Sequence, residues 1–169
     1  MYDIIILLFD ICLFRKGPED MPYSKGLLKL LFLGYIAVRA LMLSMHFSIF
    51  SVLLQLCVDA LLVFGFIWLM LVLFQKRARF CQVSSSVIGI DAIISFFALP
   101  GVATMEVHQG GLLVLLVTIS LIIWHWLVMG NIISKSIEKN IGFGLGLAFL
   151  YLFFSVRVMA ILFPIVSVF

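Results

Sequence analysis

The basic residues of this chain lie in alternate connections between long apolar stretches. Nine of the eleven Lys and Arg residues fall in three connections, and the connections between these carry none; the nine are Arg15, Lys16, Lys25, Lys29, Lys76, Arg77, Arg79, Lys135 and Lys139. In polytopic membrane proteins, connections rich in Lys and Arg stay on the cytoplasmic side. The pattern therefore predicts the spans and their orientation together, with the N-terminus in the cytoplasm and the C-terminus outside.

The composition agrees with a membrane protein. Hydrophobic residues make up 65% of the chain and charged residues 11%, whereas soluble domains average about 45–50% and about 25%. The net charge of +3 is explained by the cytoplasmic connections. Because these basic residues are spread over three connections without an aromatic stacking platform between them, we expect no nucleic-acid partner.

We expect an all-α fold in which residues 26–169 form one transmembrane domain of five helices. A helix needs about 20 residues to cross a bilayer. The five apolar stretches cover approximately residues 26–45, 49–74, 84–99, 111–133 and 141–166, and the third ends at Pro100-Gly101. This layout predicts a multi-pass protein of a cell inner membrane.

Residues 1–25 are predicted to form a cytoplasmic, interfacial segment. Residues 2–14 are apolar but too short to span. Asp3 and Asp10 are seven residues apart and share one face of a helix, which is typical of a helix that lies in the membrane interface. Gly17, Pro18 and Pro22 then interrupt the helix before the first span.

Five ionisable residues lie deep inside the predicted spans: Arg39, Asp59, Asp91, His125 and Arg157. A charge at mid-membrane costs roughly 2.5–3.5 kcal/mol on insertion scales, so such residues face the bundle interior and pair. Counted from the cytoplasmic ends at about 1.5 Å per residue, Arg39, Asp59 and Arg157 lie at about 18–24 Å, and Asp91 and His125 at about 10–12 Å. We expect Arg39, Asp59 and Arg157 to meet in the outer half, and Asp91 and His125 in the inner half.

Polar residues on the same helical faces extend this intramembrane cluster. Ser51, Gln55 and Asp59 recur every four residues and form one stripe. Three interpretations remain open for the cluster. The charges neutralise one another and fix the helix register, they line a polar cavity for a ligand or ion, or Asp91 and His125 form a proton relay.

The last stretch contains Gly142, Gly144 and Gly146. Gly142 and Gly146 are four residues apart and form a small-residue face of the kind that lets membrane helices approach closely. We expect this face to pack against another helix, either within the chain or in a partner.

Motifs of catalysis and metal binding are absent from the sequence. It contains no HExxH motif, nucleophile elbow or Cys/His pair. Glu106 and His108 in an outer connection are too few to hold a metal ion. We therefore expect a protein that is not an enzyme and that needs no cofactor and no metal.

The layout of a short N-terminal segment followed by five helices, with the N-terminus inside and the C-terminus outside, resembles the Yip1-like family of small membrane proteins. The stretches Gly17–Ser24 and Trp126–Ile133, the latter before a Gly-rich last helix, are similar to short, uncharacterised bacterial inner-membrane proteins. Eukaryotic members of that family act through protein partners in membrane traffic. The resemblance implies a partner-binding role and no catalytic residue.

The leading functional hypothesis is a non-enzymatic membrane protein that acts by association within the bilayer, as an accessory subunit or a membrane-organising scaffold. Its partners would be the lipid bilayer and other membrane proteins or further copies of the chain. The alternative is a small transporter or channel with a polar cavity lined by Arg39, Asp59, Asp91 and Arg157. An intramembrane enzyme is the weakest of the three hypotheses.

Overall fold

The computed structural model describes residues 2–44, 47–106 and 111–163, and helices account for nearly all of them. The order is α1 (Tyr2–Cys12), the 3-10 turn η1 (Pro18–Asp20), α2 (Lys25–Ser44), α3 (Ile49–Leu73), η2 (Arg77–Arg79), α4 (Phe80–Glu106), α5 (Leu112–Ile137) and α6 (Ile141–Leu162). No strand occurs in these ranges. The all-α prediction is therefore confirmed.

Helices α2 to α6 are each long and apolar enough to cross a membrane. The bounds of α2 and α3 agree with the sequence prediction to within one residue, and those of α6 do so at its start. The predicted end of the fifth span, residues 164–166, lies outside the described residues, as do His46 and the Glu106–His108 pair of side chains. Five candidate membrane spans identify a multi-pass membrane protein.

The third span is longer than predicted at both ends. Helix α4 begins at Phe80 and continues through Pro100 to Glu106, so the helix does not end at Pro100-Gly101, although the candidate span ends at Gly101. Proline removes only one backbone donor, and membrane helices tolerate it where other groups satisfy the freed carbonyl. Helix α5 also continues four residues beyond its predicted end, to Ile137.

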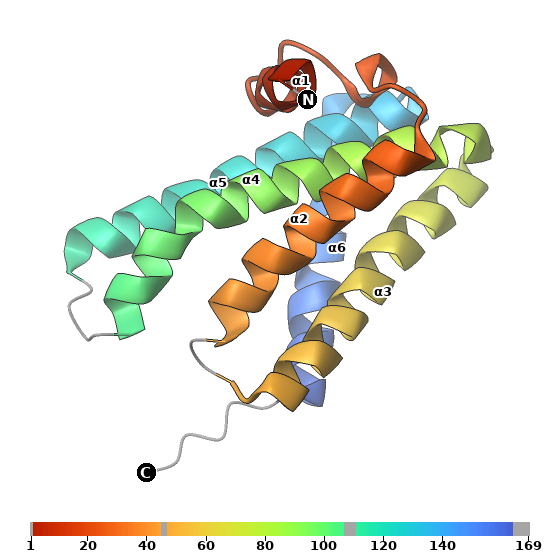
Figure 1. Cartoon of the computed structure of the whole chain (residues 1–169). Helices are drawn as coiled ribbons and strands as arrows, with labels where there is room; N and C mark the ends of the chain where they lie inside the picture. The colour runs from red at the N-terminus through yellow and green to blue at the C-terminus, as the bar shows by residue number, and fades with distance from the viewer. Residues whose placement is uncertain (1, 45–46, 107–110, 164–169) are drawn as a thin grey trace.

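The bundle is tightly packed at one end and open at the other. We call the end where α3 and α5 finish and α4 begins the basic end, because Lys76, Arg79 and Lys135 gather there. Here residues 83–91 of α4 and 128–134 of α5 are continuously buried. Towards the opposite end, α4 and α5 diverge together from α2, α3 and α6 (Figure 1).

Close contact between α5 and α6 depends on Gly130 and Gly144. A Cβ atom added at Gly144 would lie 2.3 Å from the Gly130 carbonyl oxygen. Gly142 and Gly146 are exposed, and a Cβ atom added at either would meet nothing within 4 Å. Neither glycine packs against the described residues, which leaves a partner as the alternative for this face.

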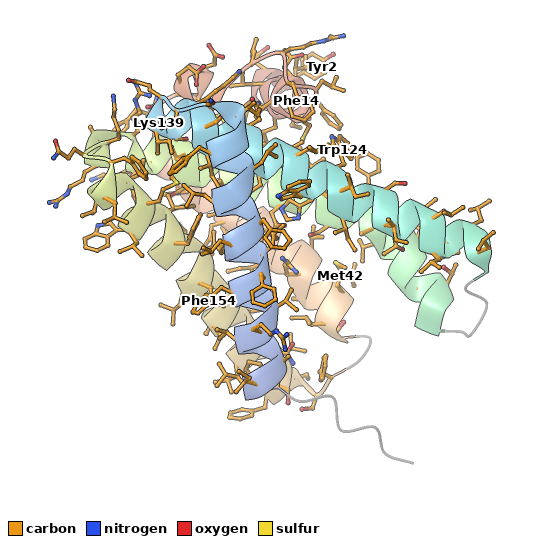
Figure 2. All side chains as sticks on the ribbon, turned by 180° about the vertical axis from the view of Figure 1, so that it is seen from behind. Tyr2, Phe14, Met42, Trp124, Lys139 and Phe154 are labelled. Carbon is orange, nitrogen blue, oxygen red and sulfur yellow. The ribbon has the colours of Figure 1, made fainter. Side chains whose placement is uncertain are left out.

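Helix α1 docks on α4 and α5. The Trp124 indole N–H donates to the Cys12 carbonyl at 3.1 Å, and Leu8 packs so closely on Gly89 that an added Cβ there would lie 2.7 Å from a Leu8 methyl group. Trp124 lies beside the N-terminal segment in Figure 2, where Tyr2 and Phe14 are also labelled. Burial raises the pKa of the Cys12 thiol to about 11.

A charged clamp joins the helix connections at the basic end. Glu138 adopts a left-handed conformation at the end of α5, and its carboxylate accepts hydrogen bonds from Lys76 and Arg79, both at 2.7 Å. The hydrogen bond from Lys76 is the largest cause that lowers the pKa of Glu138. The α3–α4 connection is thereby tied to the α5–α6 connection.

Candidate functional site

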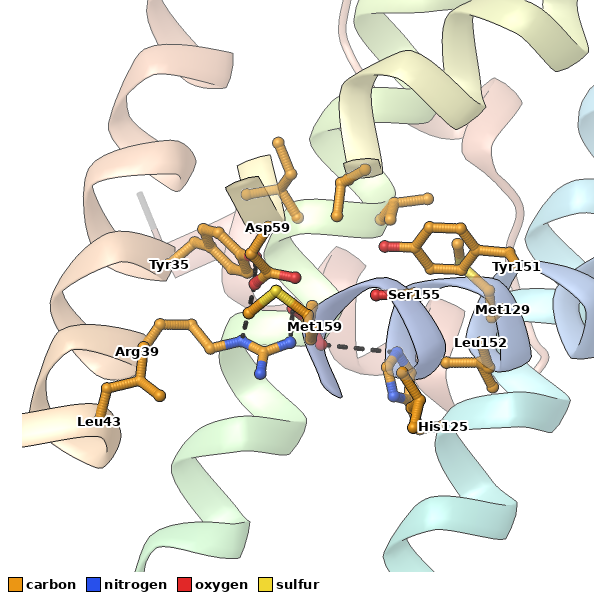
Figure 3. A pocket seen from close by; sticks show the side chains of 15 residues that line it. Tyr35, Arg39, Leu43, Asp59, His125, Met129, Tyr151, Leu152, Ser155 and Met159 are labelled. Atoms are coloured by element: carbon orange, nitrogen blue, oxygen red, sulfur yellow. Dashed lines mark hydrogen bonds and ion pairs between the residues drawn. The ribbon is translucent and has the colours of Figure 1, made fainter. Parts of the chain in front are cut away.

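The five long helices surround a cavity of about 360 Å³ within the bundle. Each contributes polar side chains to its lining: Tyr35 and Arg39 from α2, Asp59 from α3, Asp91 from α4, His125 from α5, and Tyr151 and Ser155 from α6. Figure 3 shows Arg39, Asp59 and His125 directed towards the same space. We call Tyr35, Arg39, Asp59, Asp91 and His125 the central cluster.

Helix α2 places a phenol and a guanidinium on one face. Tyr35 and Arg39 are four residues apart and are therefore neighbours on the helix surface, with the guanidinium carbon 5.6 Å from the Tyr35 ring centre. Tyr35 is almost fully buried and stacks on Phe32. Its packing fixes the position from which Arg39 extends across the cavity.

Arg39 bridges two carboxylates from different helices. Its Nη2 atom donates to Asp91 Oδ2 at 3.1 Å, and its Nε atom lies 3.6 Å from Asp59 Oδ2. The Tyr35 hydroxyl donates to the same Asp59 oxygen. Helices α2, α3 and α4 are therefore joined by charge across the middle of the bundle.

His125 completes the central cluster from α5. Its Nε2 atom lies 3.5 Å from Asp91 Oδ1. The two flanking tryptophans hold this part of α5 in place, because Trp124 donates to Cys12 of α1 and Trp126 donates to the Leu145 carbonyl of α6 at 3.0 Å. The imidazole is thus positioned by contacts on both sides of the helix that carries it.

The last helix supplies neutral hydroxyl groups that were not predicted from the sequence. Tyr151 is buried, packs on Phe66 with ring centres 4.7 Å apart, and lines the cavity with Ser155. Tyr151 and Ser155 lie on the same face of α6 as Gly144, since residues 144, 148, 151 and 155 recur at helical spacing. That spacing could have indicated that Tyr151 and Ser155 line the cavity, but the sequence prediction considered charged residues, and neither of these two is charged.

The cavity is sealed towards the basic end. One helical turn from Asp59, Asp91 and His125 in that direction, the lining consists of Val63, Ile88 and Met129, all buried. The continuously packed parts of α4 and α5 lie beyond them. Towards the opposite end, the cavity is bounded by Leu43, Val156 and Met159, none of which is fully buried.

The predicted pairs Arg39–Asp59 and Asp91–His125 are confirmed, but their division into a separate outer and inner group is wrong. Arg39 contacts both Asp59 and Asp91, so four of the predicted residues form one cluster. The reason is that α4 and α5 extend four residues further at the basic end than predicted. Counted from the observed helix ends, the four residues lie about 16–21 Å deep, a spread that the Arg39 side chain covers.

Arg157 and Gln55 are not part of this cluster. Arg157 is exposed on α6, with its guanidinium carbon 5.1 Å from the Phe153 ring centre, and forms no ion pair with the described residues. It is two residues from Ser155 and therefore about 200° around the helix from the cavity. Gln55 is buried but lines a separate hollow with Phe47 and Met159.

The described residues contain no group of three or more His, Cys, Asp or Glu side chains that could hold a metal ion. Comparison of the chain with protein-family models, curated proteins and solved structures gives no match. The Yip1-like resemblance therefore stays a prediction. What the site does has to be inferred from its own geometry.

Proposed function

We propose that this protein is a small membrane transporter whose central cavity binds a polar or charged solute. The observation that carries the proposal is the convergence of charged or polar side chains from all five long helices on one cavity of about 360 Å³. Ligand sites in proteins are typically about 300–1,000 Å³ and combine apolar walls with a few polar groups. Ionisable residues within membrane spans mark solute and ion pathways.

The proposed orientation follows the basic residues. With the basic end in the cytoplasm, the N-terminus is cytoplasmic, α1 lies in the cytoplasmic interface, and the chain occupies a cell inner membrane. The cavity is then closed towards the cytoplasm by Val63, Ile88 and Met129 and is accessible from outside. This corresponds to the outward-facing state of an alternating-access cycle.

Access from one side can be measured directly. Met159 and Leu43 lie at the outer boundary of the cavity, and Ile88 lies at its sealed floor. Each is replaced singly by cysteine, as Met159→Cys, Leu43→Cys and Ile88→Cys. In right-side-out vesicles, we expect a membrane-impermeant thiol reagent to label the first two variants and not the third. Equal labelling of all three, or labelling of the third alone, would contradict an outward opening.

Transport is tested with purified protein in reconstituted vesicles and a panel of labelled amines, amino acids, organic acids and inorganic ions. We expect uptake of at least one class and its loss in Asp91→Asn, because that change removes the carboxylate that Arg39 and His125 share. Asp10→Asn is the matched control, since Asp10 pairs with Lys16, outside the long helices. No flux for any panel member, or equal flux in both variants, would refute the proposal.

The association hypothesis remains a second candidate, and the exposed Gly142–Gly146 face supports it. Small residues four apart favour helix–helix contact in bilayers, and no described part of the chain covers this face. We expect Gly146→Leu to reduce cross-linked oligomers or co-purifying membrane proteins. Gly34→Leu, at another exposed glycine with nothing within 4 Å, is the control. A monodisperse monomer without co-purifying protein would remove this candidate.

A further inference from the structure

The central cluster carries an unbalanced charge. Asp59 and Asp91 contribute two negative charges and Arg39 one positive charge, so the sum is −1 while His125 is neutral. The uncharged groups that line the same cavity, Tyr35, Tyr151 and Ser155, do not alter this sum. An uncompensated charge within a membrane is costly. One further positive charge would balance the site.

The geometry also leaves acceptor atoms for that charge. Asp59 and Asp91 are both more than nine-tenths buried. In each, the Oδ2 atom accepts a hydrogen bond, from Tyr35 and from Arg39 respectively. Among the described residues, neither Oδ1 atom accepts a hydrogen bond, and the titratable His125 Nε2 lies 3.5 Å from Asp91 Oδ1. Because both side chains line the cavity, these oxygens are open to a donor that enters it.

The lining favours an organic cation over a bare metal ion. No metal-type cluster occurs among the described residues, and a cavity of about 360 Å³ is far larger than a dehydrated ion. Apart from the polar groups, its walls are aliphatic side chains, the ring of Tyr151 and the thioethers of Met129 and Met159. Aromatic rings attract organic ammonium groups, and methionine adapts to varied apolar shapes.

We propose that the cavity binds a small organic ammonium ion, with its charged nitrogen beside Asp91 and its apolar part against Tyr151, Met129 and Met159. This rests on the proposed transport function and names its substrate class. When the pH is low enough for His125 to take up a proton in the empty cavity, that proton supplies the missing positive charge. The amine and the proton therefore compete, and binding of one ammonium ion releases one proton to water.

The test uses purified full-length protein and three ligands of the same shape: 2-phenylethylammonium, 2-phenylethanol and phenylacetate. Isothermal titration calorimetry gives their affinities. We expect the ammonium ion to bind at least about tenfold more tightly than the alcohol, and phenylacetate to bind most weakly. Tightest binding of phenylacetate, equal binding of all three, or binding of none would overturn the inference.

Competition with the proton is tested at one position with two substitutions. In the wild-type protein, ammonium affinity is expected to fall by up to about tenfold per pH unit on the acid side of the histidine titration range. His125→Gln keeps the −1 charge, so it should bind the amine with little pH dependence. His125→Lys fills the charge permanently and should lose binding. Ammonium affinity that does not change with pH in the wild type, or unchanged binding in His125→Lys, would contradict the proposal.

Failure of this inference is distinguishable from failure of the transport function. Uptake of an anion or a neutral solute that requires Asp91 would leave the transporter standing and remove the ammonium ligand. Tight, pH-dependent ammonium binding without flux in vesicles would support the ammonium ligand and remove the transport function.

Discussion

Gly144→Ala should destabilise the protein, although alanine is the better helix former. The added methyl carbon would lie 2.3 Å from the Gly130 carbonyl oxygen and 2.8 Å from the Ser134 backbone nitrogen. Carbon–oxygen contacts are normally at least about 3.3 Å, so α5 and α6 must separate by about 1 Å. Neither neighbour can move aside, because both atoms belong to the backbone of α5.

The cost arises from weaker packing along the α5–α6 interface. A gap of 0.5–1 Å forfeits roughly a quarter to a half of each atom–atom attraction of about 0.1–0.2 kcal/mol, so the loss of this share over roughly 50 atom pairs, about as many as one buried leucine makes, is on the order of 1–5 kcal/mol. Overpacked cores are destabilised by a similar amount, about 1–3 kcal/mol. The higher helix propensity of alanine returns at most about 1 kcal/mol.

Gly142→Ala and Gly146→Ala are the matched controls in the same helix. Nothing lies within 4 Å of a Cβ atom at either position, so only the propensity gain applies and both should be neutral or slightly stabilised. Thermal unfolding in mild detergent, followed by circular dichroism, measures the difference. About 2–3 kcal/mol between Gly144→Ala and the controls corresponds to a Tm lower by roughly 5–10 °C. Equal melting of the three variants would refute the assigned contact.

Three further predictions concern the charges and the docked N-terminal helix. Arg39→Ala should lower the free energy of unfolding by about 3 kcal/mol or more, because it strands two buried carboxylates; Asp91→Asn in the same chain should restore only part of this loss, and full restoration would contradict the bridging role. Gly89→Leu should displace α1 and make Cys12, whose pKa burial raises to about 11, react with maleimide at neutral pH, whereas a thiol still protected would contradict the docking. Because the pKa of Glu138 is lowered in the folded chain, the hydrogen bonds from Lys76 and Arg79 to its carboxylate stabilise the fold at neutral pH and are lost as the pH falls through that lowered pKa. Protease cleavage of residues 74–80 should therefore rise in acid. Glu138→Gln should raise this cleavage at neutral pH and remove its dependence on pH.

The helices were predictable from the sequence because hydrophobic length alone determines whether a segment can span. The positions at which these helices start and finish at the basic end were not predictable. Residues 80–83 at the start of α4 look like part of a connection because they include Gln82, yet Gln82 donates to the Met21 carbonyl of the N-terminal segment. For Gln82, a tertiary contact with a distant part of the chain supplies the polar partner within the helix.

The candidate site was predictable as far as charge is a signal. Arg39, Asp59, Asp91 and His125 stand out because such residues are rare within spans, and the structure brings them together. Arg157 stands out equally but lies on the outer face of α6. Charge indicates that a residue needs a partner, whereas the rotation of each helix, which packing at Gly144 determines for α6, decides which residues face the cavity.

The docking of α1 has a consequence for how the protein is made. The Cys12 carbonyl receives its hydrogen bond from Trp124, which is 112 residues later in the chain. At a synthesis rate of about 5–20 residues per second, roughly 6–20 seconds pass between the emergence of the two residues from the ribosome. Helix α1 is therefore synthesised well before it can reach its place, and until α4 is inserted its apolar side has only lipid or a chaperone to cover it.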